Sequence, residues 1–299
     1  MTAPGTPGST VRYVRPGAVS AGVVFASLSL TFALADVSMF SSVGASALVL
    51  LQTVWGASVW GRLTPSRSSS PWERLGMGFV IGLVGIVVAG QLRAALGVAP
   101  LIWWSAIIGA AFLDVARTRP SLRDVLPSTA ELWLAWSAAL VILGPQWYWT
   151  LPVGGSLYLV ALAHQFSESR RLRWVTLVIA LGTTVLTVVN RPTAWRPLMF
   201  EQIYLEFVGR AAVDFGGWNN PLALGRSLDY HWVSYAWMMT YSDLLGLARL
   251  ESLVEVGPIL IALGAVAAAA ALASRIGGTR ALWWALPALA FFDTPRVWS

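Results

Sequence analysis

The sequence contains no cysteine, and all 20 of its basic residues are arginine. The lack of cysteine excludes a small secreted domain held together by disulfides, and it excludes a metal centre built on thiolates. Charged residues make up only 11% of the chain, against about 25% in an average soluble domain. So few charges among so many apolar residues exclude a disordered chain and an ordinary soluble enzyme.

Apolar residues dominate instead: they form 57% of the 299 residues, and 17 of them are tryptophan. They gather into runs that approach or reach the roughly 17–25 residues with which a helix crosses a bilayer. These runs lie near 18–40, 43–61, 75–92, 97–114, 130–149, 152–167, 174–190, 231–248, 253–273 and 281–292. No run alternates as a membrane barrel strand does. The sequence therefore predicts an all-α, polytopic integral membrane bundle with eight to ten apolar segments and the lipid bilayer as its partner.

The arginines orient these segments. The net charge of +6 does not indicate nucleic acid as a partner, because the arginines sit in short clusters between apolar runs. The clusters precede the first run and follow the second, fourth and sixth, whereas the alternate loops hold only Arg93 or no arginine. Basic loops stay on the cytoplasmic side. We therefore expect a multi-pass cell-membrane protein with a cytoplasmic N-terminus and a flexible cytoplasmic tail over 1–16. A cleaved signal peptide ending near Ala35 is the less favoured alternative.

Two regions follow from this topology. Residues 17–173 are expected to form a six-span bundle, and residues 174–299 to form further spans around a long outer loop at 191–230. Whether 231–248 crosses the membrane or re-enters is open from the sequence. The last run is short, and the chain stops seven residues after it. We therefore expect the C-terminal region to be incomplete.

An amphipathic helix is predicted at 199–213, at the start of the outer loop. Its apolar residues recur at the spacing of one helix face. They are Phe200, Ile203, Tyr204, Phe207, Val208 and Ala211. Glu206 and Arg210 lie on the opposite side, four residues apart, as an ion pair requires. Such a helix is expected along the outer membrane surface, although a plain connector would show the same pattern.

Candidate chemistry lies between this helix and the next apolar run. Asp229 is placed to cap a helix that begins at Tyr230, and a helix N-terminus beside Arg226 suits a lipid-linked phosphate. His231 follows at once, although a lone histidine is more often structural. Asp243 lies inside an apolar helix, where it needs a partner, so it predicts a polar cavity. We expect Glu201 and Asp229 to face that cavity together.

Metal binding has no specific signal. Carboxylates such as Glu201, Asp214 and Asp229 suit a hard divalent cation, but their spacing matches no known ligand pattern. No phosphate-binding glycine loop or nucleophile elbow is present. No metal or other cofactor is therefore predicted.

Residues 174–292 carry a resemblance. They comprise an apolar run, the acidic amphipathic segment, the turn at 216–221, a helix led by Tyr230-His231-Trp232, and a further apolar run. This order resembles the polytopic glycosyltransferases with the GT-C fold. It is closer still to a subfamily of envelope proteins of high-GC bacteria that carry a Tyr-His-Trp motif and have no assigned activity. Here the first acid is followed by Gln202, where many GT-C loops have a second acid.

The resemblance implies a membrane glycosyltransferase that moves a sugar from a polyprenyl-phosphate donor to a cell-envelope glycan acceptor on the outer face. In that family an acidic residue of the outer loop acts at the acceptor, and the resemblance implies Glu201 for this position. Basic residues hold the lipid phosphate, and the resemblance implies Arg226 and the helix start near His231 for them. The expected catalytic residues are Glu201, Asp229 and His231. The expected substrate-binding residues are Arg210, Arg226, Tyr230, Trp232, Tyr235 and Asp243. The alternatives are a transporter or flippase of lipid-linked sugars or polysaccharide, and a non-catalytic membrane scaffold or fragment.

The arginine distribution makes the topology testable. A reporter that is active only in the cytoplasm should be active when fused within 117–123 and inactive when fused just after Asn190. The expected sign follows from the clusters at the ends of the even-numbered runs. The opposite pattern of reporter activity would overturn the topology.

Overall fold

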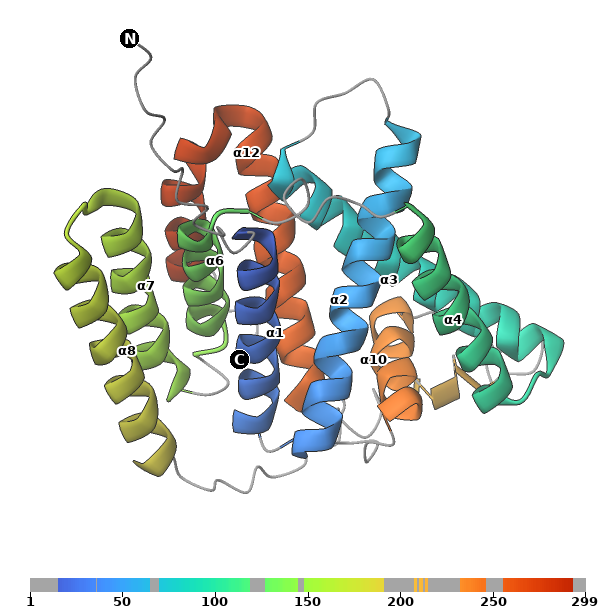
Figure 1. Cartoon of the computed structure of the whole chain (residues 1–299). Coiled ribbons are helices and arrows are strands. Elements are labelled where there is room, and N and C mark those ends of the chain that lie inside the picture. Colours follow the sequence, from blue (N-terminus) through green and yellow to red (C-terminus); the bar gives the residue numbers. More distant parts are fainter. Residues whose placement is uncertain are drawn as a thin grey trace, which may run out of the picture.

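The computed structural model describes residues 16–35, 37–64, 70–118, 127–144, 148–190, 207–208, 210–211, 213–214, 232–245 and 255–292. Over these residues it contains helices and turns and no strand, which confirms the all-α class (Figure 1). The helices are α1 (Pro16–Leu34), α2 (Met39–Leu63), α3 (Pro71–Leu96), α4 (Pro100–Thr118), α6 (Thr129–Ile142), α7 (Thr150–Phe166), α8 (Arg170–Asn190), α10 (Trp232–Leu245) and α12 (Gly257–Phe292).

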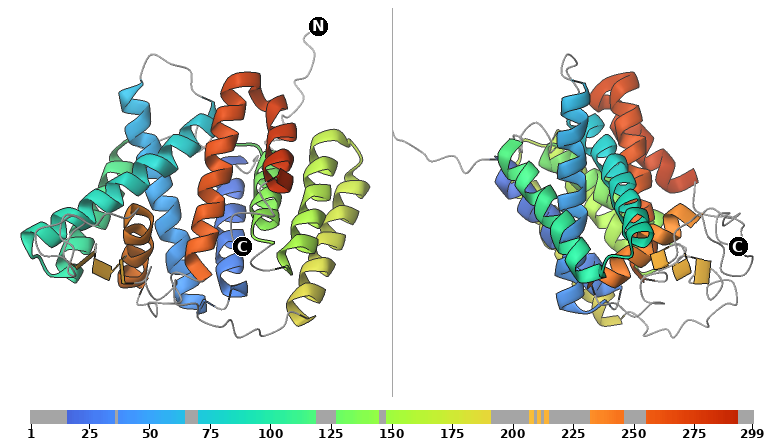
Figure 2. Two further views of the ribbon diagram at one scale, coloured as in Figure 1. Left: turned by 180° about the vertical axis from the view of Figure 1, so that it is seen from behind. Right: turned by 90° about the vertical axis from the view of Figure 1, so that its right-hand side faces the viewer.

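Five helices are long and apolar enough to cross a membrane: α2, α3, α4, α8 and α12. The chain is therefore a multi-pass membrane protein whose surroundings are a lipid bilayer. α7 and α8 lie at one side of the bundle, and α3 and α4 lie at the other, as the front and back views both show (Figures 1 and 2). One core holds them together, because α12 packs on both α3 and α6.

Two predicted runs end earlier than expected. The run at 130–149 stops as α6 at Ile142, since the sequence continues with Gly144-Pro145, and a residue before proline disfavours helical backbone. The first run, expected over 18–40, already ends at Leu34. α2 then begins at Met39, because the side chain of Ser38 accepts a hydrogen bond from the amide of Ser41 at 3.2 Å.

The last two predicted runs are one helix with a sharp bend. α12 turns at Gly278, whose φ of 65° and ψ of −164° are accessible essentially only to glycine. The limb after the bend returns beside α6 and α7, where the rings of Trp283 and Phe166 lie 5.3 Å apart. Leu282 and Leu286 are fully buried in that packing. The final run is therefore the returning arm of a helical hairpin.

The closest helix contact joins α2 to α3. Gly78 and Gly82 are four residues apart on α3, the small-xxx-small spacing that lets membrane helices approach backbone to backbone. A Cβ at Gly78 would lie 2.5 Å from the carbonyl oxygen of Thr53 and 2.8 Å from the amide nitrogen of Ala57. Gly56 on α2 meets the backbone of Gly78 in the same way. This contact leaves no room for a larger residue.

One end of the bundle, here called the basic end, collects most of the described arginines. An ion pair between Arg62 and Asp114 joins the C-terminal ends of α2 and α4 there. A second pair, between Glu73 and Arg275, joins the start of α3 to the bend of α12. Helix directions then bring eight of the ten described arginines to this end. They are Arg62, Arg74, Arg117, Arg170, Arg171, Arg173, Arg275 and Arg280. Arg93 and Arg210 lie at the opposite end.

α10 lies in the half of the bundle next to the opposite end, where its last residue, Leu245, packs against Gly44 near the start of α2. α8 finishes at that end and α12 starts there. α10 has 14 residues, about 21 Å at 1.5 Å per residue, which is too short for the roughly 30 Å hydrocarbon core. Its Tyr241 reaches Gln52, near the middle of α2. α10 is thus a half-depth helix, visible beside the lower half of α2 in Figure 1.

The glycine contact predicts the effect of a single methyl group. Gly78→Ala should lower the free energy of unfolding by about 1–3 kcal/mol, because the new Cβ meets backbone atoms that cannot move aside. Gly61→Ala, on the same pair of helices but in open space, is the matched control and should be neutral or stabilising by up to about 1 kcal/mol. Thermal unfolding in detergent measures both. Equal melting temperatures for the two variants would contradict the packing.

Candidate functional site

The candidate site lies at the opposite end, where α10, the last turn of α3 and the segment 207–214 meet. The described residues of that segment are helical, as the predicted amphipathic helix requires. Ala211 and Val213 pack against Ala236 and Met239 of α10, and all four are buried. Residues 199–206, 209 and 212 lie outside the described residues. The segment 207–214 is thus held on the half-depth helix by an apolar contact.

Arg210 fastens the same two elements by charge. Its Nη1 lies 2.6 Å from Oδ1 of Asp243 on α10, and its Nε lies 2.7 Å from Oδ2 of Asp214. Burial lowers the pKa of the guanidinium, but the charges and hydrogen bonds of Asp243 and Asp214 outweigh it, so the pKa of Arg210 lies above its ordinary value. Asp243 therefore has the partner that its apolar helix required. The predicted partner of Arg210, Glu206, lies outside the described residues.

Arg93 is a second cation at this end, and the sequence prediction did not include it. It lies in the last turn of α3 with only 8% of its surface exposed, and its Nη2 donates to the carbonyl of Val213 at 2.6 Å. Its Nε is buried and makes no hydrogen bond. A usable signal existed, because Arg93 is the one charged residue between the apolar runs at 75–92 and 97–114. Arg93 therefore presents an unused donor beside the Arg210 ion pairs.

Gln52 sets the depth of α10. Its Nε2 donates to the carbonyl of Phe79 at 3.1 Å. Its Oε1 accepts hydrogen bonds from the hydroxyl of Tyr241 at 2.8 Å and from the indole of Trp237 at 3.3 Å. The ring of Trp237 also packs edge-on against Phe79, with centroids 5.6 Å apart. One buried amide thus joins α2, α3 and α10 in the middle of the bundle.

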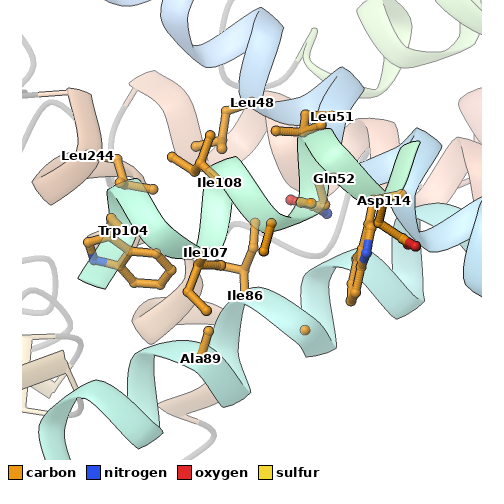
Figure 3. Close-up of a pocket in the computed structure, with 15 residues that line it drawn as sticks. Leu48, Leu51, Gln52, Ile86, Ala89, Trp104, Ile107, Ile108, Asp114 and Leu244 are labelled. Carbon is orange, nitrogen blue, oxygen red and sulfur yellow. The ribbon is translucent and has the colours of Figure 1, made fainter. Parts of the chain in front are cut away.

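Two cavities adjoin this end, on either side of α4. An open cavity of about 710 Å³ lies beside Asp243 and is walled mainly by apolar residues of α4. A second cavity of about 340 Å³, here called the crevice, lies between α2, α3 and α4 (Figure 3). Trp104, Ile108 and Leu244 line both cavities. Next to Asp243, the described residues therefore form an apolar space where the sequence predicted a polar one.

Most of the predicted site residues lie outside the described residues. They are Glu201, Arg226, Asp229, Tyr230 and His231. Trp232 and Tyr235 belong to the first turns of α10, whose described residues begin at Trp232. Of the nine predicted residues, the described contacts bring together Arg210 and Asp243. The described residues contain no group of three or more side chains able to hold a metal ion.

No protein-family model, curated protein or solved structure matches the chain. Its chemistry is therefore argued from its own residues. At one end of the bundle, two arginines and two carboxylates lie against a half-depth helix, and apolar cavities open beside them. This arrangement suits a molecule with a charged head and a hydrocarbon chain, because both parts find a matching surface within one site.

The ion pair between Arg210 and Asp243 is the contact to test. Asp243→Asn should lower the free energy of unfolding by about 1–2 kcal/mol, because it removes a charge-assisted hydrogen bond from a partly buried pair. Asp214→Asn is the matched control and should change it by about 0.5 kcal/mol or less, as for other exposed pairs four residues apart. Thermal unfolding and amide exchange of 207–214 measure the effect. Faster exchange in Asp214→Asn than in Asp243→Asn would reverse the assignment.

Proposed function

We propose that the chain is a membrane glycosyltransferase of the GT-C type. It transfers a sugar from a polyprenyl-phosphate donor to a cell-envelope acceptor at the outer face, on the side of the bundle where α10 lies. One observation carries the proposal: Asp243 of the half-depth helix is ion-paired to Arg210 of the long charged segment, directly beside an apolar cavity. A lipid-linked sugar needs such a boundary, because its phosphate must stay polar while its chain stays in hydrocarbon.

The reaction assigns a role to each group of residues. A carboxylate, Glu201 or Asp229, accepts the proton of the acceptor hydroxyl as its oxygen attacks the anomeric carbon. The bond between that carbon and the phosphate oxygen breaks, and the oxygen keeps the electron pair. Arginines stabilise the charge on the departing phosphate. Arg226 takes this role, and the buried Arg93 adds positive charge at the same end of the bundle as Arg210.

The remaining predicted residues position the substrate. Arg210 acts indirectly, since both of its bonds go to protein carboxylates and hold the outer segment on α10. His231 orients the acceptor or shares its proton. Tyr230, Trp232 and Tyr235 offer aromatic faces for the sugar ring.

A transfer assay tests the proposal. The full chain, purified into vesicles, should move a radiolabelled sugar from a synthetic polyprenyl-phosphate donor to an envelope glycan. Glu201→Gln and Asp229→Asn should each lower kcat, with a loss of about 100-fold or more for the residue that is the proton acceptor. Glu168→Gln makes the same change at an exposed position in the turn before α8 and should keep full activity.

The outcomes separate the competing functions. Movement of a fluorescent lipid-linked sugar across the vesicle membrane, without sugar transfer, would support a flippase. If a panel of donors gives neither sugar transfer nor movement across the vesicle membrane, the result would support a non-catalytic scaffold. Full activity in both carboxylate variants would remove Glu201 and Asp229 from the mechanism.

A further inference from the structure

The crevice between α2, α3 and α4 has a feature that sugar transfer does not use. α4 leaves the bundle after the short turn at Gly97 and buries only one of its side chains, Trp104. It is tied back at its far end, where Arg62 donates to both carboxylate oxygens of Asp114 at 2.7 and 2.8 Å. Between these attachments α4 stands away from its neighbours, and the crevice fills the gap.

The lining of the crevice is hydrocarbon. Trp104 and Leu244 lie at one end, Asp114 lies at the other, and Ile86 and Ile107 lie between them (Figure 3). The carboxylate and the amide in the wall are already satisfied: Asp114 by Arg62, and Gln52 by its bonds to α3 and α10. The indole Nε1 of Trp104 is buried without a hydrogen bond, but it is a single neutral donor. The described wall therefore holds no unpaired charge that would select a head group. It selects only an apolar chain.

The surroundings supply that chain. The outer face of α4 is apolar and exposed, as Leu101 at 81% and Leu113 at 68% illustrate, so bilayer lipid surrounds the helix. A cavity of about 340 Å³ lies within the roughly 300–1,000 Å³ of ordinary ligand sites. A gap of this size loses dispersion contacts on every wall unless it is filled. The acyl chains of phospholipids are the hydrocarbon present at the highest concentration around α4.

We propose that the crevice is a binding site for one phospholipid acyl chain, inserted between α3 and α4. The chain completes the packing of α4 against the bundle. It also touches Leu244, the neighbour of Asp243. A bound chain therefore helps to hold α10 where Asp243 pairs with Arg210. This site is independent of sugar transfer and would remain if the proposed activity failed.

Photolabelling with lipid tests the site. The full chain is placed in phosphatidylcholine vesicles that contain a phospholipid with a diazirine at the end of one acyl chain. Adducts are expected on Ile86, in the crevice wall, and on Leu113, on the outer face of α4. Ala111→Phe fills the crevice and should lower labelling of Ile86 about tenfold, which corresponds to about 1.4 kcal/mol of binding free energy. Labelling of Leu113 should not change.

Two further variants keep the test decisive. Ala106→Phe adds the same ring to an exposed position of α4 and should leave both adducts unchanged. Ala89→Phe fills the crevice from α3 and replaces Ala111→Phe if that variant does not fold. Unchanged labelling of Ile86 in a folded crevice variant would overturn the proposal. So would labelling of Ile86 by a diazirine-bearing prenyl phosphate but not by the phospholipid, or by neither probe.

Discussion

The hydrogen bonds of Gln52 hold the architecture of the candidate site together. A polar group in a bilayer has no water to bond, so it must find its partners inside the protein. Gln52 bonds to the backbone of α3 and to two side chains of α10. These bonds fix how deep α10 reaches. The depth of α10 in turn determines where Asp243 lies and which residues of the segment 207–214 can pack against α10.

Backbone contact between α2 and α3 makes this arrangement possible. Gly78 and Gly82 let α3 lie so close to α2 that the amide of Gln52 reaches the carbonyl of Phe79. A bundle with larger residues there would place the two helices further apart, and the amide would lose that partner. The glycines thus bring the backbones of α2 and α3 close together, and the side-chain amide of Gln52 bonds across the short distance that results.

The sequence predicted the class of fold and the order of helices well, because apolar runs and arginine clusters report directly on a membrane environment. It placed helix boundaries less well at Ile142, after which a proline stops α6, and at Met39, where the cap of Ser38 starts α2. It left the depth of α10 open, since a half-polar run has no periodicity that measures depth. In the site, the need of Asp243 for a partner was predictable from its apolar helix. Its partner Arg210 and the buried Arg93 come from distant segments, and no local pattern reports such pairings.

The divergence of α3 and α4 has a consequence for the membrane itself. α3 has 26 residues, about 39 Å at 1.5 Å per residue, whereas α4 has 19, about 28 Å. The extra length of α3 lies in its polar ends, because its apolar run covers 75–92 and is as long as the run at 97–114 that contains most of α4. Each run is about 27 Å long at 1.5 Å per residue, close to the roughly 30 Å of the hydrocarbon core. Both helices therefore cross the same hydrocarbon layer, and the wedge between them, which closes at the turn after Leu96, lies at the depth of the lipid chains.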